Sequence, residues 1–98
     1  MHNLDREYLL VIDLNSRHKA IDVEVAAIGT LADLVVSPRE IFMTAILINA
    51  YEIVLLHNHP SGDPTPSTED KLITNKLVQI GKPHQIPVRD FIILGHMC

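Results

Sequence analysis

The sequence holds few cysteines, few aromatic side chains and no cluster of positive charge. Its one cysteine, Cys98, excludes an intramolecular disulfide, which suits a reducing cytoplasm. Only 4% of the 98 residues are aromatic and none is tryptophan. Because 47% of the residues are nevertheless hydrophobic, the chain can build one small domain around a core of aliphatic side chains.

Long hydrophobic stretches are also missing. No apolar run approaches the roughly 20 residues that a transmembrane helix needs, and the first residues, MHNLDREYLL, lack the pattern of a signal peptide. The chain has 8 basic and 12 acidic residues, which gives a net charge of -4. Since proteins that bind nucleic-acid phosphates usually present a basic face, direct DNA binding by this segment is disfavoured. We expect a cytoplasmic protein without a membrane partner.

Hydrophobic periodicity and turn residues divide the chain into six elements. The expected order is strand, strand, helix, strand, helix and strand, over residues 7–15, 20–29, 37–50, 52–58, 67–80 and 88–94. The first strand is apolar enough to be buried on both faces, and the short SRHK connection predicts an antiparallel hairpin with the second strand. The fold class is therefore α/β in the mixed, α+β sense, with a mixed sheet flanked by helices.

The ends of the two expected helices carry sequence signals. Before the first helix, Ser37 can cap the free amide groups, Pro38 suits the first turn and Glu40 completes a capping box. The second helix begins near Ser67, another capping candidate, and Gly81 is expected to end it. Both helices are thereby placed in the connections between strands.

The segment HNHPSGDPTPSTED, residues 57–70, has the residue types of a metal site. His57 and His59 are two residues apart at the end of an apolar run, so on a strand both side chains point to the same face. Their Cα atoms would lie about 6.6 Å apart, a spacing from which two imidazoles can reach one ion at Zn–N distances of about 2.0 Å. A proline-rich loop then leads to the second helix, whose first turn holds Asp70. Two histidines and one carboxylate form a catalytic zinc set that leaves a fourth position for water.

Each of these residues also has an ordinary structural explanation. A single histidine in an apolar strand is usually a satisfied core or rim residue, and an acid in the first turn of a helix usually stabilises the helix dipole. Surface positions are expected for the remaining histidines, His2, His18, His84 and His96. It is the combined spacing of His57, His59 and Asp70 that favours a metal site.

This segment resembles the signature of the JAMM (JAB1/MPN/Mov34) metalloprotease domains. The signature reads H-x-H-P, six residues, S, two residues, D, and it is met by His57, His59, Pro60, Ser67 and Asp70. The sequences PREIF and HNHPSG are similar to the RadC branch of that superfamily, bacterial proteins that carry a traditional DNA-repair label. The resemblance runs from REYLLVIDLN through GT and SPREIF to DFIILG, which is nearly the whole chain.

The resemblance implies a JAB/MPN fold, akin to that of cytidine deaminase, and a definite set of site residues. It implies one zinc ion held by His57, His59 and Asp70, with water as the fourth ligand. It also implies an upstream glutamate that takes a proton from this water. In the family this glutamate stands just before the first core strand, and Glu7 occupies that position here. The serine of the family, here Ser67, supports the oxyanion that forms on the scissile carbonyl.

Three other glutamates compete with Glu7 for the role of base. Glu40 already serves the expected capping box, Glu24 fits the alternation of a half-exposed strand, and Glu52 is the third rival. Without the resemblance, Glu7 itself would be assigned as an exposed acid at the start of a strand. The assignment of Glu7 therefore depends on the family, whereas that of the three ligands also rests on their spacing.

The chain departs from full-length RadC in two respects. RadC-like sequences usually have Asp-His at the start of the last strand, whereas here Phe91 follows Asp90, which removes no ligand but changes the surroundings of the site. The N-terminal helical region and the final strand of RadC are not expected either, so residues 1–98 are interpreted as a single JAMM/MPN-type domain. An exposed edge strand on such a small sheet would favour pairing into a homodimer.

The resulting hypothesis is a bacterial, cytoplasmic zinc metallohydrolase that cleaves a peptide or isopeptide bond in a peptide or protein substrate. Two alternatives stay open: a DNA-repair-associated factor, and a non-catalytic interaction scaffold that retains the metal site. A zinc deaminase is disfavoured, because its site needs a Pro-Cys-x-x-Cys segment and the one cysteine here is the last residue. Metal content and amide-bond hydrolysis distinguish the remaining hypotheses.

Overall fold

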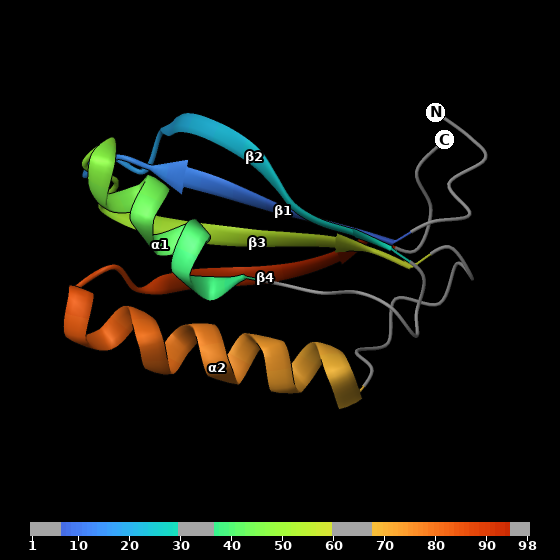
Figure 1. Cartoon of the computed structure of the whole chain (residues 1–98). Helices are drawn as coiled ribbons and strands as arrows, with labels where there is room; N and C mark the ends of the chain where they lie inside the picture. Colours follow the sequence, from blue (N-terminus) through green and yellow to red (C-terminus); the bar gives the residue numbers. More distant parts are fainter. Residues whose placement is uncertain (1–6, 30–36, 60–67, 95–98) are drawn as a thin grey trace.

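The structure, a computed structural model, describes residues 7–29, 37–59 and 68–94, which form one sheet and two helices (Figure 1). The elements are β1 (Glu7–Leu14), β2 (Ala20–Gly29), α1 (Pro38–Leu47), β3 (Glu52–Asn58), α2 (Thr68–His84) and β4 (Val88–Leu94). Across the sheet the order is β2-β1-β3-β4; β1 is antiparallel to both neighbours, and β3 is parallel to β4. The mixed sheet with helices that the sequence predicts is confirmed.

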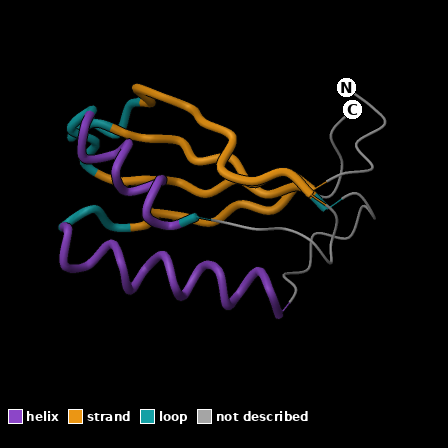
Figure 2. The backbone as a smooth tube through the Cα atoms, in the orientation of Figure 1, coloured by secondary structure: helices purple, strands orange, loops and turns teal. Residues whose placement is uncertain are grey.

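Both helices pack on the same face of the sheet. The core joins apolar side chains of β1, β3, α1, α2 and the turn after α2, namely Leu9, Val11, Ile41, Phe42, Ala45, Ile53, Leu55, Leu77 and Ile86. The tube in Figure 2 shows the helices, in purple, lying beside the sheet, in orange. Leu10 and Ile12, which alternate with the buried residues of β1, stay half-buried. The expectation that β1 is buried on both faces was wrong, because α1 and α2 cover only one.

Within the described ranges, neither helix has the length and apolar character needed to span a membrane.

The two strands β1 and β2 form the expected hairpin. The side-chain oxygen of Asn15 accepts hydrogen bonds from the main-chain N–H groups of Arg17 at 2.9 Å and Lys19 at 3.1 Å. His18 closes the turn with a φ of 63°. The asparagine thus fixes the turn through its own side chain, as this residue type commonly does.

The limits of α1 differ from the sequence expectation at both ends. Ser37 precedes the helix with an extended backbone, but its side chain makes no capping hydrogen bond. At the other end, Asn49 has a φ of 58° and the Ala50 N–H donates to the Ala45 carbonyl at 2.8 Å. This left-handed residue ends the helix in a Schellman-type turn, which makes α1 shorter than the expected 37–50.

Gly81 does not end α2, and the expectation that it would was wrong. The helix continues to His84, and Gln85, with a φ of 56°, is the left-handed residue that stops it. The N–H of Ile86 donates to the Gly81 carbonyl at 3.0 Å, and that of Gln85 to the Lys82 carbonyl at 3.1 Å. A β-carbon at position 81 would lie 2.3 Å from the Ile86 carbonyl oxygen. The glycine is therefore required for close approach inside the helix rather than for a left-handed turn.

We predict that Gly81→Ala destabilises the protein, although alanine normally favours a helix over glycine by about 1 kcal/mol. The added methyl group collides with main-chain atoms of the turn that follows α2, which cannot move as a flexible side chain would. The expected loss is about 1–3 kcal/mol of the free energy of unfolding, as for other overpacked cores. Denaturant unfolding measures it, with Lys82→Ala as the exposed neighbouring control. A Gly81→Ala variant at least as stable as the parent would contradict the packing.

Glu52 lies at the end of β3 that is remote from its histidines. Its buried carboxylate accepts a hydrogen bond from Arg89 at 3.0 Å and lies 3.0 Å from Nδ1 of His18. His18 belongs to the β1–β2 hairpin and Arg89 to β4, so one carboxylate ties three segments of the sheet together. This contact accounts for Glu52 structurally and gives His18 a partner that the sequence did not suggest.

Candidate metal centre

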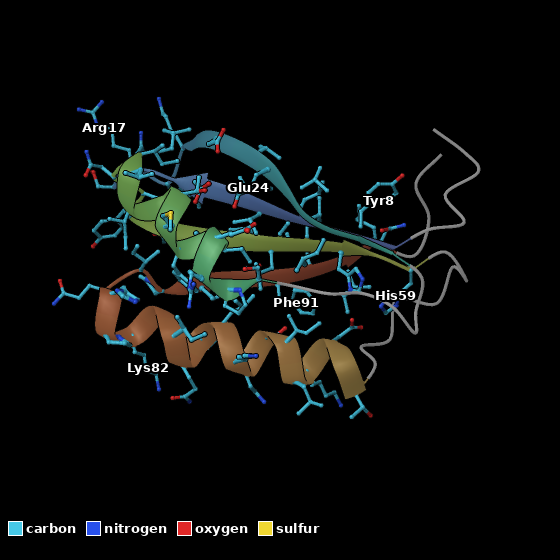
Figure 3. The ribbon with its side chains drawn as sticks, in the orientation of Figure 1. Tyr8, Arg17, Glu24, His59, Lys82 and Phe91 are labelled. Atoms are coloured by element: carbon cyan, nitrogen blue, oxygen red, sulfur yellow. The ribbon has the colours of Figure 1, made fainter. Side chains whose placement is uncertain are left out.

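The end of β3 presents two buried histidines. His57 is 2% exposed and pairs with Leu9 of β1 and Ile93 of β4. His59 is 6% exposed, and its N–H donates to the Leu94 carbonyl at 2.8 Å. Figure 3 shows His59 at the end of the sheet, near the start of α2. Main-chain pairing with both neighbouring strands therefore fixes the positions of the two imidazoles.

The first turn of α2 brings a carboxylate between these rings. Asp70 is 2% exposed; its Oδ1 lies 2.9 Å from Nδ1 of His57, and its Oδ2 lies 2.7 Å from Nε2 of His59. The two imidazole rings are nearly perpendicular, with an interplanar angle of 82°. Further along the helix, the Thr74 hydroxyl donates to the Asp70 carbonyl oxygen at 2.8 Å. The structure thus gathers the three residues that the sequence spacing had grouped.

This donor set fits a zinc ion. One ligand atom from each of the three residues lies within 4.8 Å of the other two. Ligand atoms of tetrahedral zinc, bound at about 2.0–2.1 Å, stand roughly 3.4 Å apart, so small side-chain rotations would accommodate the ion. Ligation through the atoms that now face Asp70 requires neutral rings, protonated on Nε2 in His57 and on Nδ1 in His59. The carboxylate of Asp70 would bring one negative charge to the ligand set, which suits a divalent cation.

Of the predicted base, Glu7, the structure describes the main chain, whereas the predicted oxyanion donor, Ser67, lies outside the described residues. Glu7 begins β1 and its main chain pairs with Gly29, while Leu9, two residues further, pairs with His57. At a rise of about 3.3 Å per residue, the Glu7 backbone is about 7 Å beyond the level of His57. The side chain of Glu7 and the whole of Ser67 lie outside the described residues, so both roles stay predictions.

Two of the other glutamates considered for the role of base, Glu24 and Glu52, make contacts with residues outside the candidate metal centre. Glu24 accepts a hydrogen bond from the Thr44 hydroxyl of α1, and Figure 3 shows it on β2, well away from His59. Glu52 is held by Arg89 at the remote end of β3. Neither carboxylate is close to the three candidate ligands, which leaves Glu7 as the glutamate nearest to them along the sheet.

A family model described as RadC-like JAB domain matches residues 1–98. This chain belongs to the RadC-like JAB domain family. The resemblance seen in the sequence is thereby confirmed, and the four-stranded mixed sheet with two helices is consistent with a JAB/MPN-like fold.

Relatives of this RadC-like JAB domain occur in bacteria and in an archaeon. UPF0758 protein STH371 of Symbiobacterium thermophilum is 50% identical over 95 residues, which are 97% of this chain and 41% of that relative. A UPF0758 protein of Desulforamulus reducens is 46% identical, over 97% of this chain and 42% of the relative. One of Methanosarcina acetivorans is 40% identical over the same shares. The chain spans about two fifths of the length of these curated relatives.

Asn58 stands between the two histidines of the RadC-like domain and has a structural role. It is 4% exposed, and its side-chain oxygen accepts a hydrogen bond from the main-chain N–H of Tyr8 at 2.6 Å. This bond continues the pairing of β1 with β3 beyond Leu9 and His57. It therefore holds the start of β1, where Glu7 stands, against the strand that carries the histidines.

Phe91 supports the ring of His57, a contact that the sequence did not reveal. The two ring centroids are 6.3 Å apart with an interplanar angle of 30°. Phe91 pairs with Leu55 on β3, which places it two positions from His57 on the helix-covered face. The only sequence signal was that Phe91 replaces the usual histidine of the family. Its consequence depends on the register of β4 against β3, which a single sequence does not give.

We predict that Phe91→Ala weakens zinc binding about tenfold, the lower range found when groups that orient metal ligands are removed. Without the stacked ring, His57 loses a contact that restricts its side-chain rotation. Zinc affinity is measured by competition with a chromophoric chelator, and Phe91→Tyr should restore it. Ile92→Ala is the matched control, because that side chain alternates to the other face of β4. Equal affinities in Phe91→Ala and the parent would remove Phe91 from the site.

A second buried carboxyl group lies away from the metal centre. Asp13 of β1 is fully buried, and neither carboxylate oxygen has a hydrogen-bond partner among the described residues. It faces Asp22 on β2. Burial, and to a smaller extent the charges of Glu24 and Asp22, raises its pKa from 3.8 to about 6. Burial also raises the pKa of Glu24, against the opposing effect of the Thr44 hydrogen bond.

Proposed function

We propose that this RadC-like JAB domain is a zinc-dependent metallohydrolase that cleaves a peptide or isopeptide bond in the cytoplasm. The observation that carries the proposal is the convergence of His57, His59 and Asp70 in a buried cluster built by two separate elements. Two neutral nitrogens and one carboxylate match catalytic rather than structural zinc, since structural sites usually have four protein ligands. Membership of the JAB family supports the same reaction class.

The proposed division of labour follows from the chemistry of the side chains. Bound zinc would lower the pKa of a water molecule to about 7 and polarise the scissile carbonyl. Glu7 takes the proton of the attacking water as its oxygen bonds to the carbonyl carbon. The same carboxyl returns that proton to the amine nitrogen as the C–N bond breaks, so the proton count balances. The Ser67 hydroxyl donates a hydrogen bond to the oxyanion, a contribution of about 3 kcal/mol.

The experiment measures zinc content and hydrolysis on the same preparations. We expect one zinc per chain by elemental analysis, and cleavage within a library of peptide and isopeptide substrates. Glu7→Gln should keep its zinc but lose hydrolysis by a factor of about 100 or more. Glu40→Gln, which removes an exposed acid of α1, is the control and should keep both.

The outcomes separate the proposal from its alternatives. A protein that binds no zinc at neutral pH contradicts the whole proposal. Zinc binding without hydrolysis of any substrate would instead favour a scaffold that retains the metal site. A salt-dependent gel shift with micromolar affinity for DNA would favour the DNA-repair-associated alternative, against the net charge of -4.

A further inference from the structure

The face of the sheet that turns away from α1 and α2 is apolar. Strand pairing places its residues in two rows, one formed by Val25, Leu10, Leu56 and Ile92, and one by Val23, Ile12, Val54 and Asp90. We call the seven apolar members of these rows the open face. Val23 is 56% exposed, Val25 54% and Ile92 40%, while the four central residues are half-buried.

Such a face is unusual for a sheet exposed to water. When one face of a sheet is solvated, its outward residues are normally polar. Here β1 and β3 carry apolar residues at the outward positions of both rows, Leu10 and Ile12 on β1 and Val54 and Leu56 on β3. The largest contiguous apolar patch on a protein surface is often a functional one, such as an interaction site. The open face is therefore a candidate interaction surface.

The distribution of charge favours a second copy of the same chain. The protein has a net charge of -4, yet the only charged residue in the two rows is Asp90, at one end. The buried Glu52 and its partner Arg89 lie at the same end of β3. An apolar centre with charges at its margin is the pattern of protein interfaces. Two copies can meet through it without burying like charges, whereas a nucleic acid would find no cation there.

We propose that the open face joins two copies of this chain across a two-fold axis, sheet against sheet. An apolar patch without charge can meet its own copy without electrostatic conflict, which suits a two-fold interface, where the same patch is used on both subunits. Sheets pack in this way at about 10 Å separation, with their side chains interdigitated. The arrangement places the helices and the candidate metal centre on the outer sides of the dimer. The two sites would then stay accessible.

The area of the open face indicates how strongly the two copies should associate. With strands about 4.8 Å apart and a rise of about 3.3 Å per residue, four strands cover roughly 400 Å² per copy. Stable interfaces bury about 800 Å² per partner, and weaker ones less. We therefore expect a concentration-dependent dimer with a dissociation constant on the order of 10–100 µM.

Sedimentation equilibrium from about 1 to 500 µM, a range chosen around that constant, tests the proposal on the full chain. The parent should shift from monomer to dimer, and Val23→Lys with Val25→Lys should stay monomeric throughout. Both valines are on the edge strand β2 and already exposed, so the variant should fold, which circular dichroism checks. Met43→Lys and Leu72→Lys, at helix positions that are 52% and 63% exposed, are the controls and should dimerise like the parent.

Each contrary outcome overturns the inference. A parent that is monomeric at 500 µM excludes a second copy as the occupant of the open face. A dimer that survives the double valine substitution must form elsewhere, for example by pairing of edge strands. Zinc content should be equal in the parent and the valine variant, because the candidate ligands lie away from the open face. The result therefore does not depend on whether the proposed hydrolysis is found.

Discussion

Replacing Asp70 with asparagine should abolish stoichiometric zinc binding. The substitution keeps the shape of the side chain but removes the negative charge that lies 2.9 Å from His57 and 2.7 Å from His59. An amide is a weak zinc ligand, and the remaining two imidazoles are neutral when they bind metal. We expect the affinity at pH 7 to fall by a factor of about 100 or more, beyond the effect of losing a group that only orients a ligand.

The loss should also appear as stability. Zinc that binds only the folded state, at a free concentration of about 1,000 times its dissociation constant, adds about 4 kcal/mol to the free energy of unfolding. Asp70→Asn should show almost none of this increment when zinc is added. Calorimetric titration and thermal unfolding with and without zinc measure both effects.

The matched control is Asp90→Asn, which makes the same change of charge at an exposed position of β4. There the carboxylate accepts a hydrogen bond from the Phe91 N–H at 2.8 Å and lies away from the three candidate ligands. Zinc affinity and zinc-dependent stabilisation should be those of the parent. If Asp70→Asn binds zinc as tightly as this control, Asp70 is a capping residue of α2 and the metal centre must be rejected.

Replacing Asp13 with valine should stabilise the protein at neutral pH. The carboxyl group is fully buried and has no hydrogen-bond partner among the described residues, so its ionised form is costly. Valine suits a strand and removes the charge. Replacement of buried ion pairs by apolar residues can raise stability by about 1–4 kcal/mol, and for this single carboxyl group we expect about 2 kcal/mol. For a domain of this size that corresponds to roughly 10 °C in Tm.

The gain from Asp13→Val should depend on pH in a defined direction. The pKa of Asp13 is raised from 3.8 to about 6, because of its burial and then the charges of Glu24 and Asp22. The folded state therefore holds this proton more tightly than the unfolded chain. The stabilisation from protonation is complete below pH 3.8 and is lost as the pH rises through about 6. A shift of about two units corresponds to about 3 kcal/mol.

Denaturant unfolding of the parent and of Asp13→Val at intervals from about pH 3 to pH 8, which spans both pKa values, separates this effect from other titrations. The difference between the two proteins should be smallest at the acid end and grow until about pH 7. Asp13→Asn removes the charge but keeps the shape, and should remove the pH dependence with a smaller gain in stability. A difference that is constant across this range would show that Asp13 does not titrate as its burial implies.

Several parts of the fold follow from local sequence patterns. Alternation and turn residues placed all six elements, and the hairpin was predicted from a short connection whose turn is held by the side chain of Asn15. Helix limits were less accurate, because they depend on contacts made elsewhere. Gly81 was assigned as the end of α2, whereas the structure uses it for contact with the Ile86 main chain and ends the helix at Gln85. A local pattern does not distinguish a glycine needed for conformation from one needed for space.

The candidate ligands were readable from the sequence because they lie within one segment of fourteen residues. A strand fixes the relative direction of His57 and His59, and a helix start fixes Asp70, so little depended on distant parts of the chain. Only the tertiary structure decided what surrounds them. The contact of Phe91 with His57, the bond from Tyr8 to Asn58 and the sheet face that neither described helix covers all depend on strand register and on the side that the helices take. Those choices arise from contacts between residues far apart in the chain, and the amino-acid pattern of one segment does not contain them.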